Sequence, residues 1–201
     1  MSEIRLGVLV SGSGTILESI LDHQIPVEIV VSDRACRALD VATEFGVTAR
    51  LIDRRQYSPT ATFDRERFTG ALIDQLVESR IDLVAMAGFG TIVTGGIYER
   101  FADRILNTHP SLLPLFKGWH AVRDALEAGA TVTGCTVHLS RLELDDGPVL
   151  AQTEVAVKPE DSEITLHERI KEVERELYPR VIIAAMAALT RNESLSSLRI
   201  N

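Results

Sequence analysis

Short, uniformly apolar runs alternate with longer amphipathic runs through the first two-thirds of this chain. Strands that are apolar on both faces and separated by helices are typical of a parallel sheet covered on both sides. The alternation therefore predicts an α/β fold with a mostly parallel central sheet. The expected strands lie at 4–10, 27–32, 47–52, 82–89 and 104–109, and the expected helices near 14–22, 35–45, 60–79 and 94–101.

The last third of the chain has a different pattern. Two longer apolar runs, 131–140 and 148–157, are joined by the turn sequence RLELDDG, which predicts an antiparallel hairpin added to the sheet. A long helix is expected to begin at Asp161 or Ser162, either of which can cap it. Pro179 lies inside that helical pattern, so we expect a kink or a split there.

The length and composition narrow the class of protein. The 201 residues show no repeat or linker, so we expect a single domain, 1–201. With 21 basic and 29 acidic residues the net charge is −8, which argues against nucleic acid as the main partner. The N-terminus lacks a signal-peptide pattern, and no apolar run has the length of a membrane helix. We therefore expect a cytoplasmic protein without a membrane partner.

The first predicted strand ends in a glycine-containing loop, SGSGT (11–15), which leads into a helix. Gly12 and Gly14 let backbone approach a ligand, and Ser13 and Thr15 add hydroxyl groups at the helix N-terminus, where amide donors suit a phosphate. A dinucleotide fingerprint would need a third glycine where Leu17 stands. The loop therefore indicates either phosphate binding or only a tight turn.

The stretch ILNTHP (105–110) sets polar side chains at the end of an apolar strand. Side chains two apart on a strand point to the same side, so Asn107 and His109 can face one ligand. Pro110 favours an extended backbone at His109. An imidazole can donate a proton and an amide can hold a carbonyl oxygen. A structural histidine bonded to backbone is the alternative.

A third strand-end segment is ELDDGPV (143–149). Asp146 and Gly147 have the composition of a tight turn, and turn chemistry explains both aspartates. The alternative is that Asp145 reaches His109 and favours its protonated form. The sequence leaves both interpretations open.

Motifs along nearly the whole chain resemble the phosphoribosylglycinamide formyltransferases, members of the folate-dependent formyltransferase family. The Asn-x-His-Pro-Ser-Leu-Leu-Pro element is the most specific of them. The shared motifs are SGSGT, AGFG (87–90), NTHPSLLP (107–114), KGWHAVRDALEAG (117–129), TGCTVHL (133–139), DDGPVLAQ (145–152) and ERELYPRVI (174–182).

The resemblance implies a Rossmann-like formyltransferase fold and transfer of a formyl group from 10-formyltetrahydrofolate, as co-substrate, to the amine of glycinamide ribonucleotide in purine biosynthesis. It implies direct transfer, with no metal and no covalent intermediate. The implied catalytic residues are Asn107, His109 and Asp145. The implied ribonucleotide contacts are Gly12, Ser13, Gly14, Thr15 and Glu174, with phosphate binding in the half near 1–100 and catalysis and folate binding in the half near 101–201. The implied folate contacts are Arg65, Gly90, Thr91, Ile92, Val93, Asn107, Arg141, Leu142, Glu143 and Leu144.

Four positions depart from the pattern of the family. Ile16 replaces an asparagine of some members, Gly90-Thr91 replaces a bulky pair such as Met-Arg, Lys117 replaces the usual proline, and Asp146 replaces a glycine or threonine. The Gly90-Thr91 departure puts in question the affinity for folate and the shape of this side of the folate site. None of them removes Asn107, His109 or Asp145.

Other functions remain to be weighed. Methionyl-tRNA formyltransferases add a basic C-terminal barrel and formyltetrahydrofolate deformylases an N-terminal domain, so both are weaker matches. A nicotinamide-dependent oxidoreductase would use Asp33 for a ribose, and a catalytically silent nucleotide-binding module would explain the unusual Gly90-Thr91. His120 and His138 are expected to be structural or cleft-lining, and the histidines are too scattered for a metal site. Related enzymes are often dimers, so a homodimer is an open alternative.

Overall fold

The structure is a computed structural model that describes residues 4–58 and 62–200. The chain divides into two compact units, unit 1 with Met1–Ile105 and unit 2 with Leu106–Asn201. Across the described residues, no helix has the length and apolar content that crossing a membrane requires.

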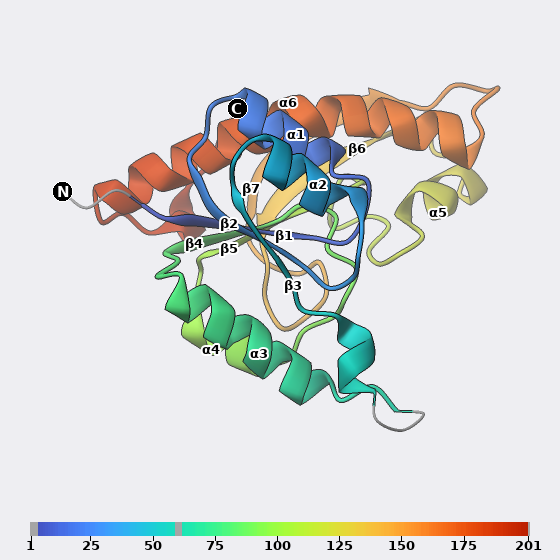
Figure 1. Ribbon diagram of the computed structural model, residues 1–201. Coiled ribbons are helices and arrows are strands. Elements are labelled where there is room, and N and C mark those ends of the chain that lie inside the picture. The colour runs from blue at the N-terminus through green and yellow to red at the C-terminus, as the bar shows by residue number, and fades with distance from the viewer. Residues whose placement is uncertain (1–3, 59–61, 201) are drawn as a thin grey trace. The chain divides into compact units, whose positions relative to one another are not determined.

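Unit 1 is a parallel β-sheet covered by helices on both faces. Strand β1 pairs in parallel with β2 and with β4, and β2 pairs in parallel with β3. Figure 1 shows α1 and α2 on one side of these strands and α3 and α4 on the other. The strands are β1 (Leu6–Val10), β2 (Val27–Ser32), β3 (Thr48–Leu51) and β4 (Leu83–Met86), and the helices are α1 (Thr15–Asp22), α2 (Arg37–Glu44), the short 3-10 helix η1 (Arg54–Tyr57), α3 (Arg65–Glu78) and α4 (Gly95–Arg100).

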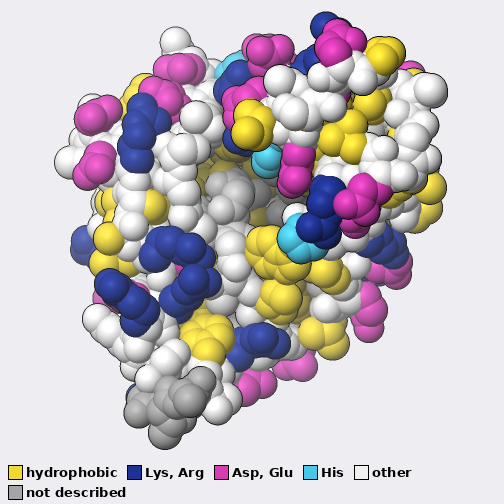
Figure 2. Space-filling view, turned by 90° about the vertical axis from the view of Figure 1, so that its right-hand side faces the viewer, with side chains coloured by type: hydrophobic (Ala, Val, Ile, Leu, Met, Phe, Trp, Pro, Cys, Tyr) yellow, Lys and Arg dark blue, Asp and Glu magenta, His cyan; other side chains and the backbone are white. Residues whose placement is uncertain are grey.

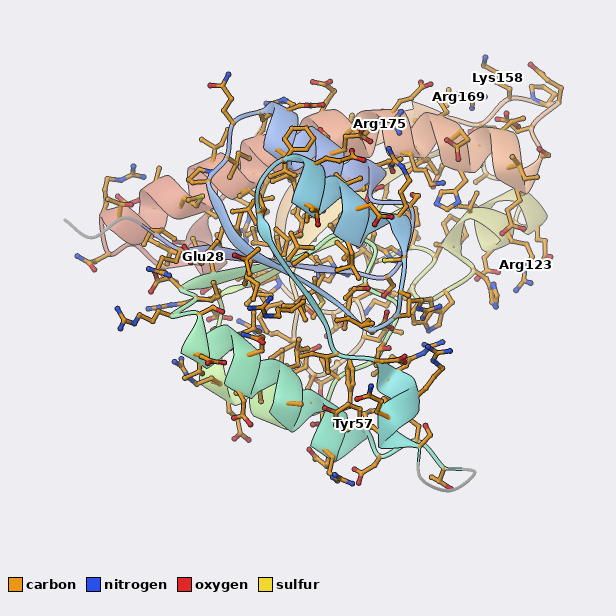
Figure 3. The ribbon with its side chains drawn as sticks, viewed as in Figure 1. Glu28, Tyr57, Arg123, Lys158, Arg169 and Arg175 are labelled. Carbon is orange, nitrogen blue, oxygen red and sulfur yellow. The ribbon has the colours of Figure 1, made fainter. Side chains whose placement is uncertain are left out.

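One buried apolar cluster of unit 1 lies between the strands and α3. Leu9 and Ile29 of the strands pack with Phe68 and Leu72 of α3 in one buried cluster. Tyr57 packs edge-on against Phe68 with ring centroids 5.6 Å apart, and its side chain is labelled in Figure 3. Full burial of a large apolar side chain stabilises the fold by about 1.5–3 kcal/mol. This cluster therefore holds the strands of unit 1 in place, together with the loops at their ends.

Unit 2 is an antiparallel sheet packed against one long helix. Strand β5 (Ile105–His109), whose first residue closes unit 1, pairs antiparallel with β6 (Val132–Leu139), and β6 pairs antiparallel with β7 (Val149–Ala156). Helix α5 (Ala121–Glu127) lies between β5 and β6 in the chain, and α6 (Glu163–Thr190) packs against β6 and β7. A short 3-10 helix, η2 (Leu195–Ser197), follows α6.

Helix α6 begins with a capping box formed by Ser162 and Thr165. Asp161 strengthens this start, because its carboxylate accepts two hydrogen bonds of 2.7 and 2.8 Å from the guanidinium of Arg169, which Figure 3 labels. The helix continues without a break through Pro179, so of the two expected alternatives the split is wrong and the kink stays a prediction. Pro179 is buried together with Leu177, Tyr178, Val181 and Ile182, and that burial offsets the one backbone hydrogen bond that proline cannot make.

The strand order is β3-β2-β1-β4-β5-β6-β7 in a seven-stranded sheet. This confirms the predicted α/β class, the mostly parallel sheet and the antiparallel hairpin with a long helix at the C-terminal end. In each case the predicted bounds lie within a few residues of the observed ones, apart from the expected helix at 60–79, which begins as α3 only at Arg65.

Candidate active site

Strand β5 presents two sets of side chains to its two faces. Asn107 and His109 share one face and Thr108 lies on the other, because side chains alternate along a strand. Asn107 is paired with His138 across the antiparallel ladder and His109 with Thr136, so these residues also share the first face. The sequence-based expectation that Asn107 and His109 face the same side therefore agrees with the strand geometry.

His109 is buried, and both ring nitrogens face oxygen atoms. Its Nε2 donates to the carbonyl of Phe116 at 2.8 Å, because a carbonyl oxygen can only accept. Its Nδ1 lies 3.4 Å from a carboxylate oxygen of Asp145. The side chains of His109 and Asp145 are 6 % and 4 % exposed, so water screens this pair little. The structure thus brings the imidazole and the carboxylate together.

Asp145 lies in a turn and also reaches His109, so the two interpretations of this aspartate are compatible. Its Oδ2 accepts a 2.9 Å hydrogen bond from the backbone N–H of Gly118. The next residue, Asp146, forms an ion pair with Lys117 that lowers the pKa of the Asp146 carboxyl. Two of the departures from the family pattern therefore compensate each other in charge.

His138 has contacts that the sequence analysis did not anticipate. It is fully buried on β6, its Nδ1 lies 3.0 Å from the Leu139 carbonyl oxygen, and its Nε2 lies 3.2 Å from Nδ2 of Asn107. Its Nε2 also lies 3.7 Å from Oδ1 of Asp145. No signal in the sequence pointed to these contacts, because the predicted hairpin paired 131–140 with 148–157, whereas His138 meets Asn107 through the pairing of β6 with β5.

Glu174 lies with Thr108, on the face of β5 opposite to Asn107. Burial raises the pKa of Glu174 to about 7, although a hydrogen bond from Thr108 acts in the other direction. Cys135 lies 3.3 Å from the Thr108 hydroxyl, and burial followed by the nearby Glu174 charge raises the pKa of its thiol to about 12. This thiol is therefore uncharged at neutral pH and is no candidate nucleophile.

In unit 1 the glycine-containing loop lies where β1 runs into α1. Gly14 has a positive φ of 80° and is the N-cap of α1, without a side-chain hydrogen bond to the cap. A Cβ atom at Gly14 would lie 2.8 Å from the Cα of Ala38, so only glycine fits there without a shift. Gly12 and Ser13 are exposed, and Arg37 donates to the Ser13 carbonyl at 2.8 Å. The free N–H groups of the first helical turn suit an anion.

Of the predicted folate residues in unit 1, Gly90 and Thr91 lie beside the buried Asp33 or its partner Arg34. The Thr91 hydroxyl donates to Asp33 at 2.5 Å, and the guanidinium of Arg34 donates to both carboxylate oxygens of Asp33. A Cβ at Gly90 would lie 3.3 Å from Nη2 of Arg34, so the small residue leaves room for this arginine. Ile92 is exposed, whereas the side chain of Val93 belongs to the apolar core.

The remaining predicted contacts are exposed. Arg65 is an exposed residue in the first turn of α3 in unit 1. In unit 2 the loop residues Arg141, Leu142, Glu143 and Leu144 are all exposed. Figure 2 shows hydrophobic side chains at the surface of the face that it draws. By their exposed fractions, the exposed apolar residues of unit 2 include Leu115, Trp119, Leu142 and Leu144.

The same geometry bears on the rival interpretations. Asp33 is fully buried and its oxygens are taken by Arg34 and Thr91, so it presents no carboxylate to a ribose. Burial acts to raise its pKa, but the hydrogen bonds from Arg34, Thr91 and Ser11 together lower it. Within residues 4–58 and 62–200, no three His, Cys, Asp or Glu side chains are grouped to hold a metal ion.

A carboxamide and an imidazole at the end of one strand, with the imidazole paired to a buried carboxylate from the turn between β6 and β7, can stabilise an oxyanion, which is the chemistry of a group-transfer enzyme. The comparisons with known proteins agree with this class. A model of the formyl transferase family matches residues 4–182, and the chain belongs to that family. The predicted family and enzyme class are thereby confirmed.

Among curated relatives, "Phosphoribosylglycinamide formyltransferase" of Mycobacterium tuberculosis is 44% identical over 193 residues, covering 92% of this chain and 84% of that protein. "Trifunctional purine biosynthetic protein adenosine-3" of Homo sapiens is 38% identical over 185 residues, covering 89% of this chain and 18% of that protein.

Solved structures agree. Glycinamide ribonucleotide transformylase 1 from Symbiobacterium toebii superposes with a TM-score of 0.81 at 43% identity, covering 88% of this chain and 84% of that one. Phosphoribosylglycinamide formyltransferase from Brucella melitensis superposes with a TM-score of 0.83 at 32% identity, covering 92% and 97% of the two chains.

Proposed function

We propose that this protein transfers the formyl group of 10-formyltetrahydrofolate to the amine of glycinamide ribonucleotide, a step of purine biosynthesis. The names of the relatives from Mycobacterium tuberculosis and Symbiobacterium toebii support this choice of substrate. Both reactants are small molecules, and the reaction needs no metal and no covalent link to the enzyme.

In the proposed reaction the neutral amine of the ribonucleotide attacks the formyl carbon. The carbonyl oxygen becomes an oxyanion, a C–N bond forms to the amine, and the C–N bond to the folate nitrogen then breaks. The Asn107 amide and the protonated His109 ring donate hydrogen bonds to the oxyanion, and one such donor is typically worth about 10²–10³ in rate. The proton leaves the attacking amine, passes through water beside Asp145, and arrives on the leaving nitrogen.

The observation that carries this proposal is the pairing of His109 with Asp145 at 3.4 Å, beside Asn107 on the same strand. The Nε2–H of His109 already donates to an oxygen of a carbonyl group, that of Phe116. We assign the formyl oxygen as the acceptor that replaces this carbonyl during the reaction. An imidazole held between a carboxylate and a carbonyl oxygen is suited to stabilise a developing negative charge.

We assign the substrate contacts from the family resemblance and the exposure of each residue. The loop of Gly12 to Thr15 would hold the ribonucleotide phosphate at the start of α1, and Glu174 would contact the ribonucleotide. Arg65, the backbone of Gly90 to Val93, and the loop of Arg141 to Leu144 would contact the folate. In this scheme Thr91 and Val93 contribute through their backbone, because their side chains are buried.

We further propose a cytoplasmic enzyme with one catalytic domain, in which residues near 1–100 hold the ribonucleotide phosphate and residues near 101–201 supply catalysis and folate contacts. From the family resemblance alone, we propose that the enzyme is a homodimer. Light scattering on the purified chain gives the mass in solution, and a mass near 22.1 kDa would show a monomer instead.

The test of the proposed function is a formyl-transfer assay with both substrates, in which the deformylated folate and the formylated ribonucleotide are measured separately. We expect both products in equal amounts. Asn107→Ala and His109→Ala should each lower kcat by about 10²–10³ with melting temperatures near the wild-type value. Free formate in place of the formylated amine would indicate a deformylase, and full turnover of both folded variants would contradict the mechanism.

A further inference from the structure

His138 stands next to the proposed oxyanion donor and has a fixed partner at each ring nitrogen. It is fully buried on β6, directly opposite Asn107 in the antiparallel ladder. The pairing of β6 with β7 is irregular between Val137 and His138, and such irregularities in a sheet often redirect a side chain beside an active site.

The partners of His138 determine where its proton lies. The carbonyl oxygen of Leu139, 3.0 Å from Nδ1, has no hydrogen to give, so Nδ1 must carry the proton. In a neutral ring Nε2 then carries no proton, and its lone pair can only accept a hydrogen bond. Its neighbour at 3.2 Å is Nδ2 of Asn107, and so the amide of Asn107 donates to the ring.

We propose that His138 is a positioning residue, whose Nε2 lone pair holds the Asn107 carboxamide with its nitrogen toward β6 and one N–H left for the oxyanion. This inference rests on the proposed function, in which Asn107 stabilises the oxyanion. If the Asn107 carboxamide flipped by 180°, its Oδ1 would face the lone pair of His138 Nε2, and the two would repel each other. The nitrogen would then leave its position, and the oxyanion would lose a donor.

The surroundings of His138 favour the neutral ring that this arrangement needs. Burial lowers the pKa of His138, while the bond to Leu139 and the charge of Asp145 act in the opposite direction. The charged or titratable groups that face the ring are Asp145, His109 and Lys117, of which the last two oppose a further positive charge. If His138 gains a proton in acid, Nε2 becomes a donor, and it turns from Asn107 to Oδ1 of Asp145, 3.7 Å away.

Two variants separate positioning from packing. Gln in place of His138 can place an acceptor oxygen near the Nε2 position, whereas Asn can keep a donor toward the Leu139 carbonyl but does not reach Asn107. We expect His138→Gln to retain kcat within about fivefold, and His138→Asn to lose about 10- to 100-fold with KM nearly unchanged. The melting temperatures of the two variants report any difference in packing.

A third measurement tests whether the effect passes through Asn107. In an Asn107→Ala background, His138→Asn should change kcat by less than about threefold, because the group that it positions is already gone. The acid limb of the kcat profile that reflects His138 should be absent from His138→Gln. Nitrogen-15 shifts of the wild-type ring should show the proton on Nδ1.

Three outcomes would overturn the inference: equal losses in both variants, an undiminished loss in the Asn107→Ala background, or a proton on Nε2 in the neutral ring. An inactive wild-type protein would instead contradict the proposed function. In that case the nitrogen-15 shifts still decide whether His138 accepts from Asn107.

Discussion

At the scale of single residues, Asp145 has a backbone conformation that few residue types adopt. Its φ is 53°, in the left-handed region that aspartate and asparagine visit more readily than most other non-glycine residues. The Gly118 N–H holds one of its carboxylate oxygens, and that oxygen lies 3.4 Å from Nδ1 of His109. The turn thus directs the carboxylate to the imidazole, and the aspartate next to it points to a different partner, Lys117.

The pair Asp145 and Asp146 allows a matched test of this difference. We expect Asp145→Asn to lower kcat by about 10²-fold, because the amide keeps an acceptor for Gly118 but removes the negative charge beside His109. Asp146→Asn removes the same charge one residue away, at an exposed ion pair, and should change kcat by less than about threefold. Steady-state kinetics on both variants, with circular dichroism to confirm folding, give the comparison.

An equal loss in both variants would mean that the total charge of the loop matters and the contact with His109 does not. A normal kcat in Asp145→Asn would remove this carboxylate from the mechanism altogether. Measurement at two salt concentrations separates these cases, since a long-range effect of charge weakens with salt.

Part of the geometry of the candidate site could be predicted from the sequence. Asn107 and His109 could be placed on one face from strand alternation alone. The contact of Asp145 with His109 could not be chosen over turn chemistry, because it depends on how a loop closes on β5. His138 was expected to be structural because its partner lies across a ladder whose register the sequence does not give. The ion pair between Lys117 and Asp146 joins two separate loops, so it could not be predicted from the sequence either.

At the scale of elements, the sequence predicted strands and helices well where the apolar pattern was strong. The fully buried strands β1 and β4 are examples, since every residue in each of them is buried. Of the kink or split expected at Pro179, the split was wrong because local propensity was weighed without the packing of α6, which buries Leu177, Tyr178 and Val181 around the proline. Helix α6 therefore continues through Pro179 because of its tertiary packing, which the local sequence does not show.

Helix α6 also carries a carboxyl group whose ionisation opposes folding. Glu174 has an ordinary pKa of 4.5 and a folded-state pKa raised to about 7 by burial. Between these two values the unfolded chain has released the proton and the folded chain still holds it. The folded state therefore binds more protons in this window, and the free energy of unfolding falls as the pH rises through it.

We expect Glu174→Gln to remove this dependence. From pH 4.5 to pH 7.5 the wild-type protein should lose about 2–3 kcal/mol of unfolding free energy relative to the variant, and the difference should stay constant at higher pH. Urea denaturation at a series of pH values measures it. Glu176→Gln, an exposed position two residues away on the same helix, is the matched control and should follow the wild-type curve. Parallel curves for Glu174→Gln and the wild-type protein would show that Glu174 is solvated.

At the scale of the whole molecule, the net charge of −8 acts on every ligand that approaches. The proposed substrates are anions, one with a phosphate and one with carboxylates, so the mean field of the protein repels both. Hydrogen-bond donors within the site must therefore outweigh this repulsion for the substrates to bind. In unit 1 an exposed cation next to the glycine-containing loop, Arg37, is paired with Glu18 at 3.4 Å and adds little net positive charge.

This repulsion predicts an unusual salt dependence. The screening length shortens from about 30 Å at 0.01 M salt to about 10 Å at 0.1 M, so added salt should weaken the long-range repulsion and leave contacts within the site nearly intact. We expect kcat/KM for the ribonucleotide to rise about two- to threefold between 10 and 150 mM sodium chloride, with kcat nearly constant. The added salt should be a chloride, because sulfate or phosphate would compete with the ribonucleotide phosphate for the glycine-containing loop. A fall in kcat/KM over the same range would mean that basic side chains near the site, and not the net charge, govern the encounter.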